Sequence, residues 1–321
     1  MEKKPLISVI VLCYNQENTI GRTLDSILNQ KTNYSYEIII GEDASPGDNT
    51  RAVCEQYAKK YPDLIYLMPE HPNKGLLQNY SDCIAKSNGK YIATCAGDDW
   101  WSNPDKLELQ VSFLENNDNY GVIYTDLSVI NVDTGELLED FNSSNQKDMP
   151  SGEIYKELLF ENKISACTAL FKKQLFLENI DLLEFKSLGF IMEDYPMWLE
   201  LSKQTKFKYL PVSTSTYSIG DGSLSNNNQF GKIEEFELNC NLIRKHYISK
   251  YPLKGIDDNY LDRKLYKTLV LRGTVRKHFK EARFYANKLP VNSVKDLMFK
   301  WICFSPAILL FSKYLKYIKC A

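Results

Sequence analysis

The stretch Tyr91-Ile92-Ala93-Thr94-Cys95-Ala96-Gly97-Asp98-Asp99-Trp100-Trp101 joins an apolar run to two adjacent acids. The apolar run is typical of a buried strand, and the two acids fall where that strand should end. Neighbouring carboxylates in such a position are costly to keep ionised without a counter-charge. A divalent cation bridging to a phosphate ligand would supply that charge, so Asp98 and Asp99 indicate a metal site. The alternative is a solvated turn in which one of the two acids caps the next helix.

Strand-like and helix-like segments alternate upstream of this stretch. Continuous apolar, β-branched runs predict strands, and they cover residues 8–14, 37–43, 65–68 and 91–95. Between them, apolar residues recur at helical spacing, as at Ile20, Leu24 and Ile27. Alternation of this kind predicts an α/β fold in which a parallel sheet with right-handed crossovers carries helices on both faces.

Ligands of parallel α/β sheets bind beyond the carboxyl ends of the strands. That rule gathers a set of polar or acidic strand-end residues in one crevice: Cys13, Tyr14, Asn15, Glu42, Asp43, Asp98 and Asp99. The alternative is that polar residues end strands simply because loops are hydrated.

The chain beyond the acidic pair predicts a second set of elements. Asn103-Pro104-Asp105 opens a helix in the favoured order of cap, N1 proline and acid. The remaining expected segments are a strand at 121–126, a loop at 133–152, a helix at 153–161, and strands at 165–171 and 207–217.

Glu193 and Asp194 form a second adjacent acidic pair, two residues before Pro196. Pro196 suits the first turn of a helix, so the pair lies at a helix N-terminus, where the helix dipole favours carboxylates. Taken alone, the two residues are explained better by simple helix capping.

Residues 229–321 have a different character. Helical periodicity dominates to about residue 287 without a strand signal, so we expect a catalytic domain at 1–228 and a helical region at 229–321. The segment 292–321 carries five lysines against one acid, around an apolar run at 301–311. That run is too short to span a bilayer, which needs roughly 20 residues. Its basic flanks favour peripheral membrane contact; packing on the domain or on a second copy in a homodimer is the alternative.

Composition narrows the class of partner and the compartment. The net charge of −2 gives the chain no electrostatic reason to bind nucleic acid. Eight cysteines without a C-x-x-C pair argue against a zinc site or disulfide framework. With no apolar signal segment at the start of the chain, we expect a cytoplasmic protein, peripheral to the inner face of the membrane if the basic segment binds lipid.

Five segments in order resemble glycosyltransferase family 2, the GT-A type of nucleotide-sugar transferase, over roughly residues 5–220. They are residues 8–15, 40–45, 73–75 with 87–92, 97–99 and 193–194. The resemblance implies a GT-A, Rossmann-like fold with a mostly parallel sheet flanked by helices, here followed by a C-terminal helical extension.

The resemblance also implies roles for individual residues. Asp99, with Asp98, would ligate Mg²⁺ or Mn²⁺, and Asp194 would be the catalytic base, with Glu193 beside it as a second candidate. The expected nucleotide-binding residues are Cys13, Tyr14, Asn15, Glu17, Glu42, Asp43, Lys74 and Asp98. The sequence departs from the family pattern at three places: Ala96 and Gly97 replace a further acid, Glu42 replaces the usual Asp, and residues 217–220 lack the basic and histidine residues often found there.

The expected activity is inverting transfer of a sugar from a nucleoside-diphosphate sugar, with uridine as the favoured nucleotide, to a glycan or lipid-linked acceptor in cell-envelope polysaccharide synthesis. A carboxylate opposite the leaving group would take the proton of the acceptor hydroxyl. An NAD-binding dehydrogenase fits poorly, because Cys13-Tyr14-Asn15 supplies no glycine to admit a pyrophosphate. A non-catalytic nucleotide-binding or scaffold protein on the same fold remains the alternative.

Overall fold

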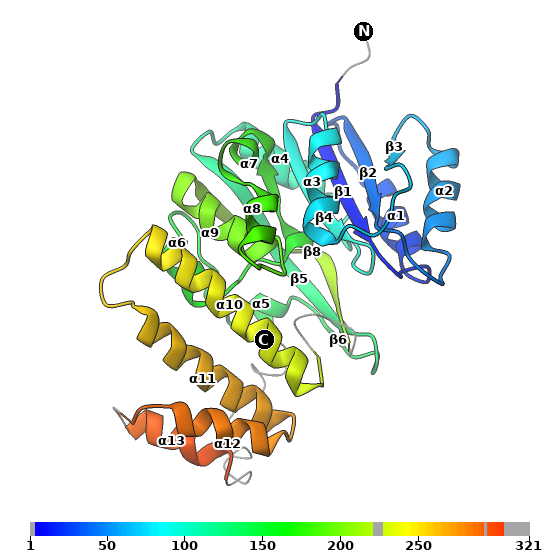
Figure 1. Cartoon of the computed structure of the whole chain (residues 1–321). Helices are drawn as coiled ribbons and strands as arrows, with labels where there is room; N and C mark the ends of the chain where they lie inside the picture. Colours follow the sequence, from blue (N-terminus) through cyan, green and yellow to red (C-terminus); the bar gives the residue numbers. More distant parts are fainter. Residues whose placement is uncertain (1–3, 221–226, 292–293, 305–321) are drawn as a thin grey trace. The chain divides into compact units, whose positions relative to one another are not determined.

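The computed structural model describes residues 4–220, 227–291 and 294–304 (Figure 1). The chain divides into two compact units between Ser218 and Ile219. The boundary expected near residue 228 stays a prediction about where the catalytic domain ends.

The first unit begins with four parallel strands in the order β3-β2-β1-β4. The strands are β1 (Ile7–Cys13), β2 (Tyr36–Glu42), β3 (Ile65–Leu67) and β4 (Tyr91–Ala96). The helices that connect them are α1 (Ile20–Leu28), α2 (Thr50–Lys60) and α3 (Leu76–Lys86). The predicted alternation of strands and helices is therefore confirmed.

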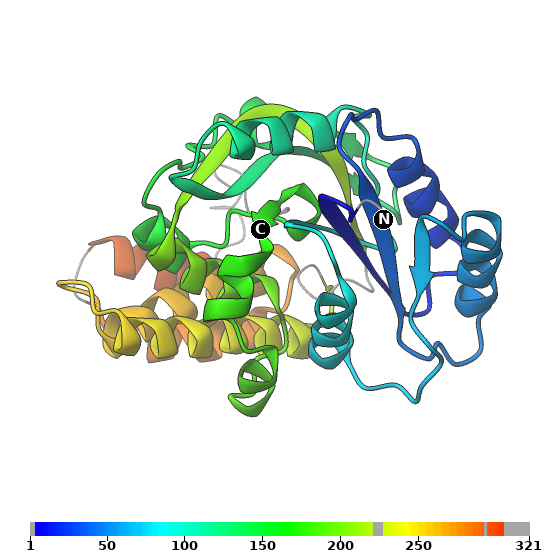
Figure 2. The same cartoon turned by 90° about the horizontal axis from the view of Figure 1, so that it is seen from above.

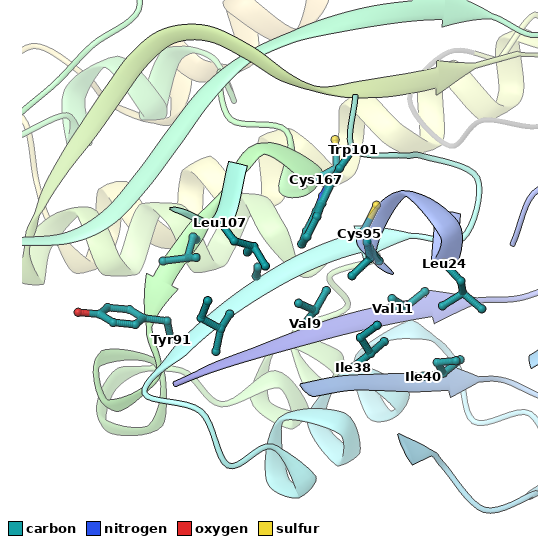
Figure 3. Close-up of a cluster of buried hydrophobic side chains, with 14 of the residues drawn as sticks. Val9, Val11, Leu24, Ile38, Ile40, Tyr91, Cys95, Trp101, Leu107 and Cys167 are labelled. Carbon is teal, nitrogen blue, oxygen red and sulfur yellow. The ribbon is translucent and has the colours of Figure 1, made fainter. Parts of the chain in front are cut away.

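Alternate residues of β1 and β2 point to opposite faces of the sheet, and each face is covered by helices. Val9, Val11, Ile38 and Ile40 point toward Leu24 of α1 and toward residues that follow β4 (Figure 3). Helix α3 packs on the opposite face, where Asn79 hydrogen-bonds to Gly41 of β2. Seen from above, α1 and α2 lie to one side of β1 and β2, and α3 lies to the other (Figure 2). A strand buried on both sides needs the continuous apolar run that the sequence has.

The sheet continues past β4 with antiparallel strands. Strand β7 (Leu170–Lys172) pairs antiparallel with both β4 and β5 (Tyr120–Asn131). β6 (Leu137–Leu138) and β8 (Lys206–Ile219) also pair with β5, so eight strands form one sheet in the described residues. The expected strand at 165–171 is in fact a 3₁₀ turn, Ala166–Thr168, followed by the short β7.

Helices pack around this second half of the sheet. The loop expected at 133–152 contains β6 and the short helix α5 (Phe141–Ser144). The other helices are α4 (Lys106–Glu115), α6 (Tyr155–Phe160), α7 (Lys173–Asn179), α8 (Leu182–Ser187) and α9 (Asp194–Gln204). The sequence pattern did not predict α7 and α8, which lie in a segment of irregular periodicity.

The second unit is helical throughout its described residues. It consists of α10 (Phe230–Lys250), α11 (Asp258–Val275), α12 (Phe279–Lys288) and α13 (Val294–Ile302). Its core gathers Phe230, Leu269, Tyr285 and Cys303, and a buried ion pair joins Arg272 to Glu237. Within the described ranges, no helix is both long enough and apolar enough to cross a membrane.

We predict that Gly89→Ala lowers the free energy of unfolding by about 1–3 kcal/mol, because overpacking strains a close contact. A Cβ on Gly89 would lie 2.5 Å from the backbone nitrogen of Ser8, which is fixed in β1. Urea denaturation followed by circular dichroism would measure the change.

Gly21→Ala in α1 is the matched control. Its Cβ would meet only the Tyr57 side chain, at an ordinary 3.5 Å, so alanine should stabilise the helix by up to about 1 kcal/mol. Equal effects of the two substitutions would contradict the packing described for Gly89.

Candidate active site

The ends of β1 and β2 lie side by side, since Cys13 stands opposite Glu42 in the parallel register. The Cys13 thiol lies 3.8 Å from the thiol of Cys54, and both side chains are buried. The hydrogen bond to Cys54, followed by burial, raises the pKa of the Cys13 thiol. The Cys13 side chain therefore belongs to the core, and its backbone carbonyl contributes to the site by accepting the N–H of Asp43 at 3.1 Å.

The loop after β1 is fastened to the loop after β2. Asn15 has a positive φ of 54° and donates its backbone N–H to the Ser45 hydroxyl at 2.9 Å. Glu17 accepts the backbone N–H of Asn49 at 2.6 Å. Asparagine tolerates the left-handed region better than most residues, which suits it to this turn. Tyr14 lies between these contacts with 45% of its surface exposed, so its ring is free to line a ligand.

Glu42 and Asp43 are both buried and both accept backbone N–H groups. Glu42 accepts from Ser45 at 2.7 Å. Asp43 accepts from Lys74 at 3.0 Å and from Gly75 at 2.9 Å, one on each carboxylate oxygen. The Lys74 ammonium forms an ion pair with Asp82 on α3. Asp43 therefore fixes the loop that leads into α3, and the structure brings the predicted residues of three loops together at one edge of the sheet.

Asp99 is the more deeply placed of the two acids after β4, with 3% of its surface exposed. Its carboxylate accepts the backbone N–H of Ser218 at 2.8 Å and a hydrogen bond from the Cys167 thiol. Burial, followed by the charge of Asp98, raises the pKa of Asp99 well above its usual range. This side chain connects the turn to the end of β8.

Asp98 is only partly buried, and its carboxylate hydrogen-bonds to the Gln16 side chain. Its carbonyl oxygen accepts from the Arg22 guanidinium at 3.0 Å and from the Ser218 hydroxyl at 2.7 Å. Burial raises the pKa of Asp98, although Arg22 and Gln16 act in the opposite direction. The effect of burial is the larger, so Arg22 and Gln16 do not fully offset the cost of ionising Asp98. A carboxylate in this position suits a hard cation, whose preferred protein ligands are oxygens.

The turn has room for glycine alone at position 97. A Cβ there would lie 2.5 Å from the Gln16 side-chain oxygen and 2.8 Å from the Cys13 Cβ. Within the described residues, no group of three or more His, Cys, Asp or Glu side chains is arranged to hold a metal ion.

Glu193 and Asp194 begin α9. The Asp194 carboxylate accepts the Tyr195 N–H at 2.6 Å and the Asn162 side-chain amide at 3.1 Å. Burial raises the pKa of both carboxyls, and the charge of Asp194 adds to the effect on Glu193. Both carboxyls therefore bind a proton more tightly than usual, which suits the pair to accept one from a bound hydroxyl.

Helix α3 links this pair to the strand-end loops. Tyr80 of α3 is buried, and its hydroxyl has no hydrogen-bond partner in the described part of the chain. The charges of Glu193 and Asp194 add to burial in raising the pKa of Tyr80, which places its ring near both carboxylates. One residue earlier, Asn79 donates to the carbonyl of Gly41 at 2.8 Å.

Four site residues were not predicted from the sequence: Gln16, Arg22, Tyr80 and Lys106. The Arg22 guanidinium lies 3.7 Å from the centre of the Trp100 ring. The fully buried Lys106 donates to Gln110 and to the Thr168 carbonyl, and burial lowers its pKa to about 7. A lysine within a helical pattern, such as Lys106, gives no local indication in the sequence that it is buried. Arg22 gives a weak indication, because it interrupts an otherwise apolar helix start.

The family model for glycosyl transferase family 2 matches residues 8–175, more than half of the 321 residues. The match covers the strand-end loops and the Asp98–Asp99 turn, and it confirms the resemblance stated from the sequence.

Two relatives show how far the similarity extends. An uncharacterized protein of Mycobacterium tuberculosis is 31% identical over 174 residues, which are 54% of this chain and 49% of that protein. The chain thus spans about half the length of the first curated relatives it matches. The Escherichia coli UDP-Glc:alpha-D-GlcNAc-diphosphoundecaprenol beta-1,3-glucosyltransferase WfgD is 27% identical over 268 residues, 81% of this chain and 97% of that enzyme.

A solved structure has the same fold. The mannosyltransferase PcManGT from Pyrobaculum calidifontis, in complex with GDP-Man and Mn²⁺, superposes with a TM-score of 0.60. The superposition covers 99% of this chain and 84% of that enzyme at 15% sequence identity. The α/β fold expected from the resemblance, with its C-terminal helices, is confirmed by this likeness.

We predict that Glu193→Gln changes how stability depends on pH. The folded-state pKa of Glu193 is raised from 4.5 to about 8, so the native state holds this proton more tightly than the unfolded chain. The free energy of unfolding should therefore fall as the pH rises from 4.5 to about 8, and glutamine at position 193 should remove this part of the fall.

The measurement is urea denaturation of both proteins at pH 5 and pH 8.5. The gain in free energy of unfolding from Glu193→Gln should be larger at pH 8.5. Parallel pH dependences for the two proteins would show that the carboxyl is not perturbed as described.

Proposed function

Because this chain belongs to glycosyl transferase family 2, we propose that it is an inverting glycosyltransferase using a nucleoside-diphosphate sugar. The observation that carries the proposal is the Asp98–Asp99 turn, which places a partly buried carboxylate beside the loops that end β1 and β2. The Escherichia coli relative is named for an acceptor linked to diphosphoundecaprenol, which supports a role in cell-envelope polysaccharide formation.

The donor nucleotide would lie in the crevice at the strand ends. In this proposal the exposed Tyr14 ring lines the base, while Glu42 and Asp43 hold the surrounding loops in shape. Asn15, Glu17 and Lys74 would contribute mainly by shaping these loops, since their side chains or N–H groups already form contacts within the protein. The printed name of the Escherichia coli relative gives UDP-Glc as its donor, which supports uridine as the nucleotide here.

The proposed cofactor is Mg²⁺ or Mn²⁺. Its chemistry would be to neutralise the charge that develops on the leaving nucleoside diphosphate. The partial exposure of Asp98 supports giving it the direct ligand role. Asp99, which the sequence favoured as ligand, already accepts two hydrogen bonds within the protein and would chiefly hold the turn.

The proposed catalytic base is Asp194, with Glu193 storing or sharing the proton. The carboxylate takes the proton of the acceptor hydroxyl, whose oxygen forms a bond to the anomeric carbon. The bond from that carbon to the diphosphate oxygen breaks, and the electron pair leaves with the nucleoside diphosphate. Attack on the face opposite the leaving group inverts the anomeric centre in one step.

The acceptor would be a glycan or a lipid-linked saccharide. The Escherichia coli relative, which the chain covers almost entirely, is named for an undecaprenol-diphosphate-linked acceptor. We accordingly propose that the protein works at the cytoplasmic face of a membrane. The homodimer considered from the sequence stays a prediction. A catalytically inactive nucleotide-binding protein is the competing function, which cation-dependent hydrolysis of a nucleotide sugar would exclude.

The first test concerns the base. Asp194→Asn should lower kcat by about 10²–10⁴-fold, because the acceptor hydroxyl loses its proton acceptor. The Kd for the nucleoside diphosphate, measured by calorimetry with Mn²⁺, should stay within about twofold of that of the unsubstituted protein.

Glu184→Gln is a suitable control, because this carboxyl lies on α8 near the pair in sequence but outside it. It should leave kcat unchanged. An unchanged kcat for Asp194→Asn would refute the assignment of the base, and a lost nucleotide affinity would show that the residue acts in binding.

The second test separates the two aspartates of the turn. Asp98→Ala should raise the Mn²⁺ concentration needed for half-maximal activity with little loss of stability. Asp99→Ala should lower the free energy of unfolding by about 1–3 kcal/mol, because the Ser218 N–H loses its acceptor.

Metal titration of activity and urea denaturation of the same samples give both readouts. Similar stability and metal dependence in the two variants would contradict this division of roles.

A further inference from the structure

Exposed aromatic side chains lie on α12 and at the end of α13 in the second unit. Figure 1 shows the two helices, which pack against each other. Phe284, Trp301 and Phe304 are 54%, 59% and 49% exposed. Among the residues that the structure describes, they are the only exposed Phe or Trp side chains. Together with Leu297, which is 45% exposed, they form what we call the aromatic patch.

Two different faces can be followed along α13 and its end. Asp296 and Cys303 are buried, and Phe299 packs against the helical core. Leu297, Trp301 and Phe304 recur at intervals of four and three residues, which places them along the other face. The Trp301 and Phe304 ring centres lie 6.2 Å apart. Because the inner face already supplies the packing, these outer side chains are not needed for the core.

Cations border the aromatic patch. The Arg283 guanidinium lies 4.9 Å from the centre of the Phe304 ring, and the Lys288 ammonium lies 4.2 Å from that of Phe284. The segment from Lys277 to Phe304 contains six Lys or Arg residues against two acids. One of those acids, Asp296, is neutralised inside the unit by Lys267 at 2.8 Å and by Arg263.

We propose that the aromatic patch of α12 and α13 inserts into the interfacial region of an anionic lipid bilayer. Amphipathic aromatic side chains favour the headgroup level, and the bordering cations attract anionic lipids. A second copy of the chain would bring the same cations together, so charge complementarity favours a lipid surface over self-association. The sequence beyond the patch adds Lys313, Lys316 and Lys319 with no acid.

This inference extends the contact expected at 292–321 to Phe284, Arg283 and Lys288 of α12. It stands independently of the proposed transferase activity, since binding to lipid requires neither donor nor acceptor.

The test is co-sedimentation of the full chain with vesicles of phosphatidylglycerol and phosphatidylethanolamine, compared with phosphatidylcholine alone. The protein should bind the anionic vesicles, with an affinity that falls as salt is raised. The triple substitution Phe284→Ser, Trp301→Ser and Phe304→Ser should weaken binding at least about tenfold. Arg283→Gln with Lys288→Gln should weaken it roughly five- to thirtyfold, at about fivefold per charge.

Leu177→Ser on α7 is the matched control, because Leu177 is equally exposed, at 54%, but lies in the first unit. Circular dichroism checks that each variant stays folded, and the lipid and salt dependence of the unsubstituted protein tests the proposal without any substitution. Failure to bind anionic vesicles, binding unaffected by the triple substitution, or a dimer that this substitution converts to monomer would each overturn the proposal.

Discussion

The last two backbone carbonyls of β1 hold the candidate site together. The Leu12 carbonyl accepts the N–H of Gly97 at 2.9 Å, and the Cys13 carbonyl accepts the N–H of Asp43 at 3.1 Å. Because β1 lies between β2 and β4 in a parallel register, these two hydrogen bonds reach the loops on either side. The acidic turn, the Glu42–Asp43 loop and the loop after β1 are thereby fixed to one strand end, beyond which ligands of this kind of sheet bind.

The candidate site keeps several carboxyls in unfavourable surroundings. Burial raises the pKa values of Asp98, Asp99, Glu193 and Asp194, so each ionised form is less stable here than in water. Ionising a carboxyl in such surroundings costs free energy, and carboxyls of this kind are found where a ligand or a reaction offsets their charge. The Asp43 carboxylate has a structural role, because it accepts two backbone N–H groups of the loop that leads into α3.

The first half of the fold could be predicted because its strands are buried on both faces and therefore have continuous apolar sequences. The antiparallel direction of β7 could not, since three residues between a 3₁₀ turn and α7 contain no directional signal. In the candidate site, the acids after β2 and β4 could be predicted because they follow apolar strands. Their partners Arg22, Tyr80 and Lys106 could not be predicted, because they reach the site through tertiary packing that places helices α1, α3 and α4 against it. The division of roles between Asp98 and Asp99 also depends on Ser218, which lies 119 residues beyond Asp99 in the sequence and contacts the turn from the end of β8.

The buried thiols close to these loops give the protein an internal reporter of local opening. Cys13 and Cys54 lie behind the loop after β1, and Cys95 and Cys167 lie behind the acidic turn. Burial raises the pKa of the Cys95 and Cys167 thiols, so they present almost no thiolate to solvent while the core is closed. The rate at which an alkylating reagent modifies them is therefore governed by how often the core opens. One pair of cysteines therefore reports on opening behind the loop after β1 and the other on opening behind the acidic turn, without any label being introduced.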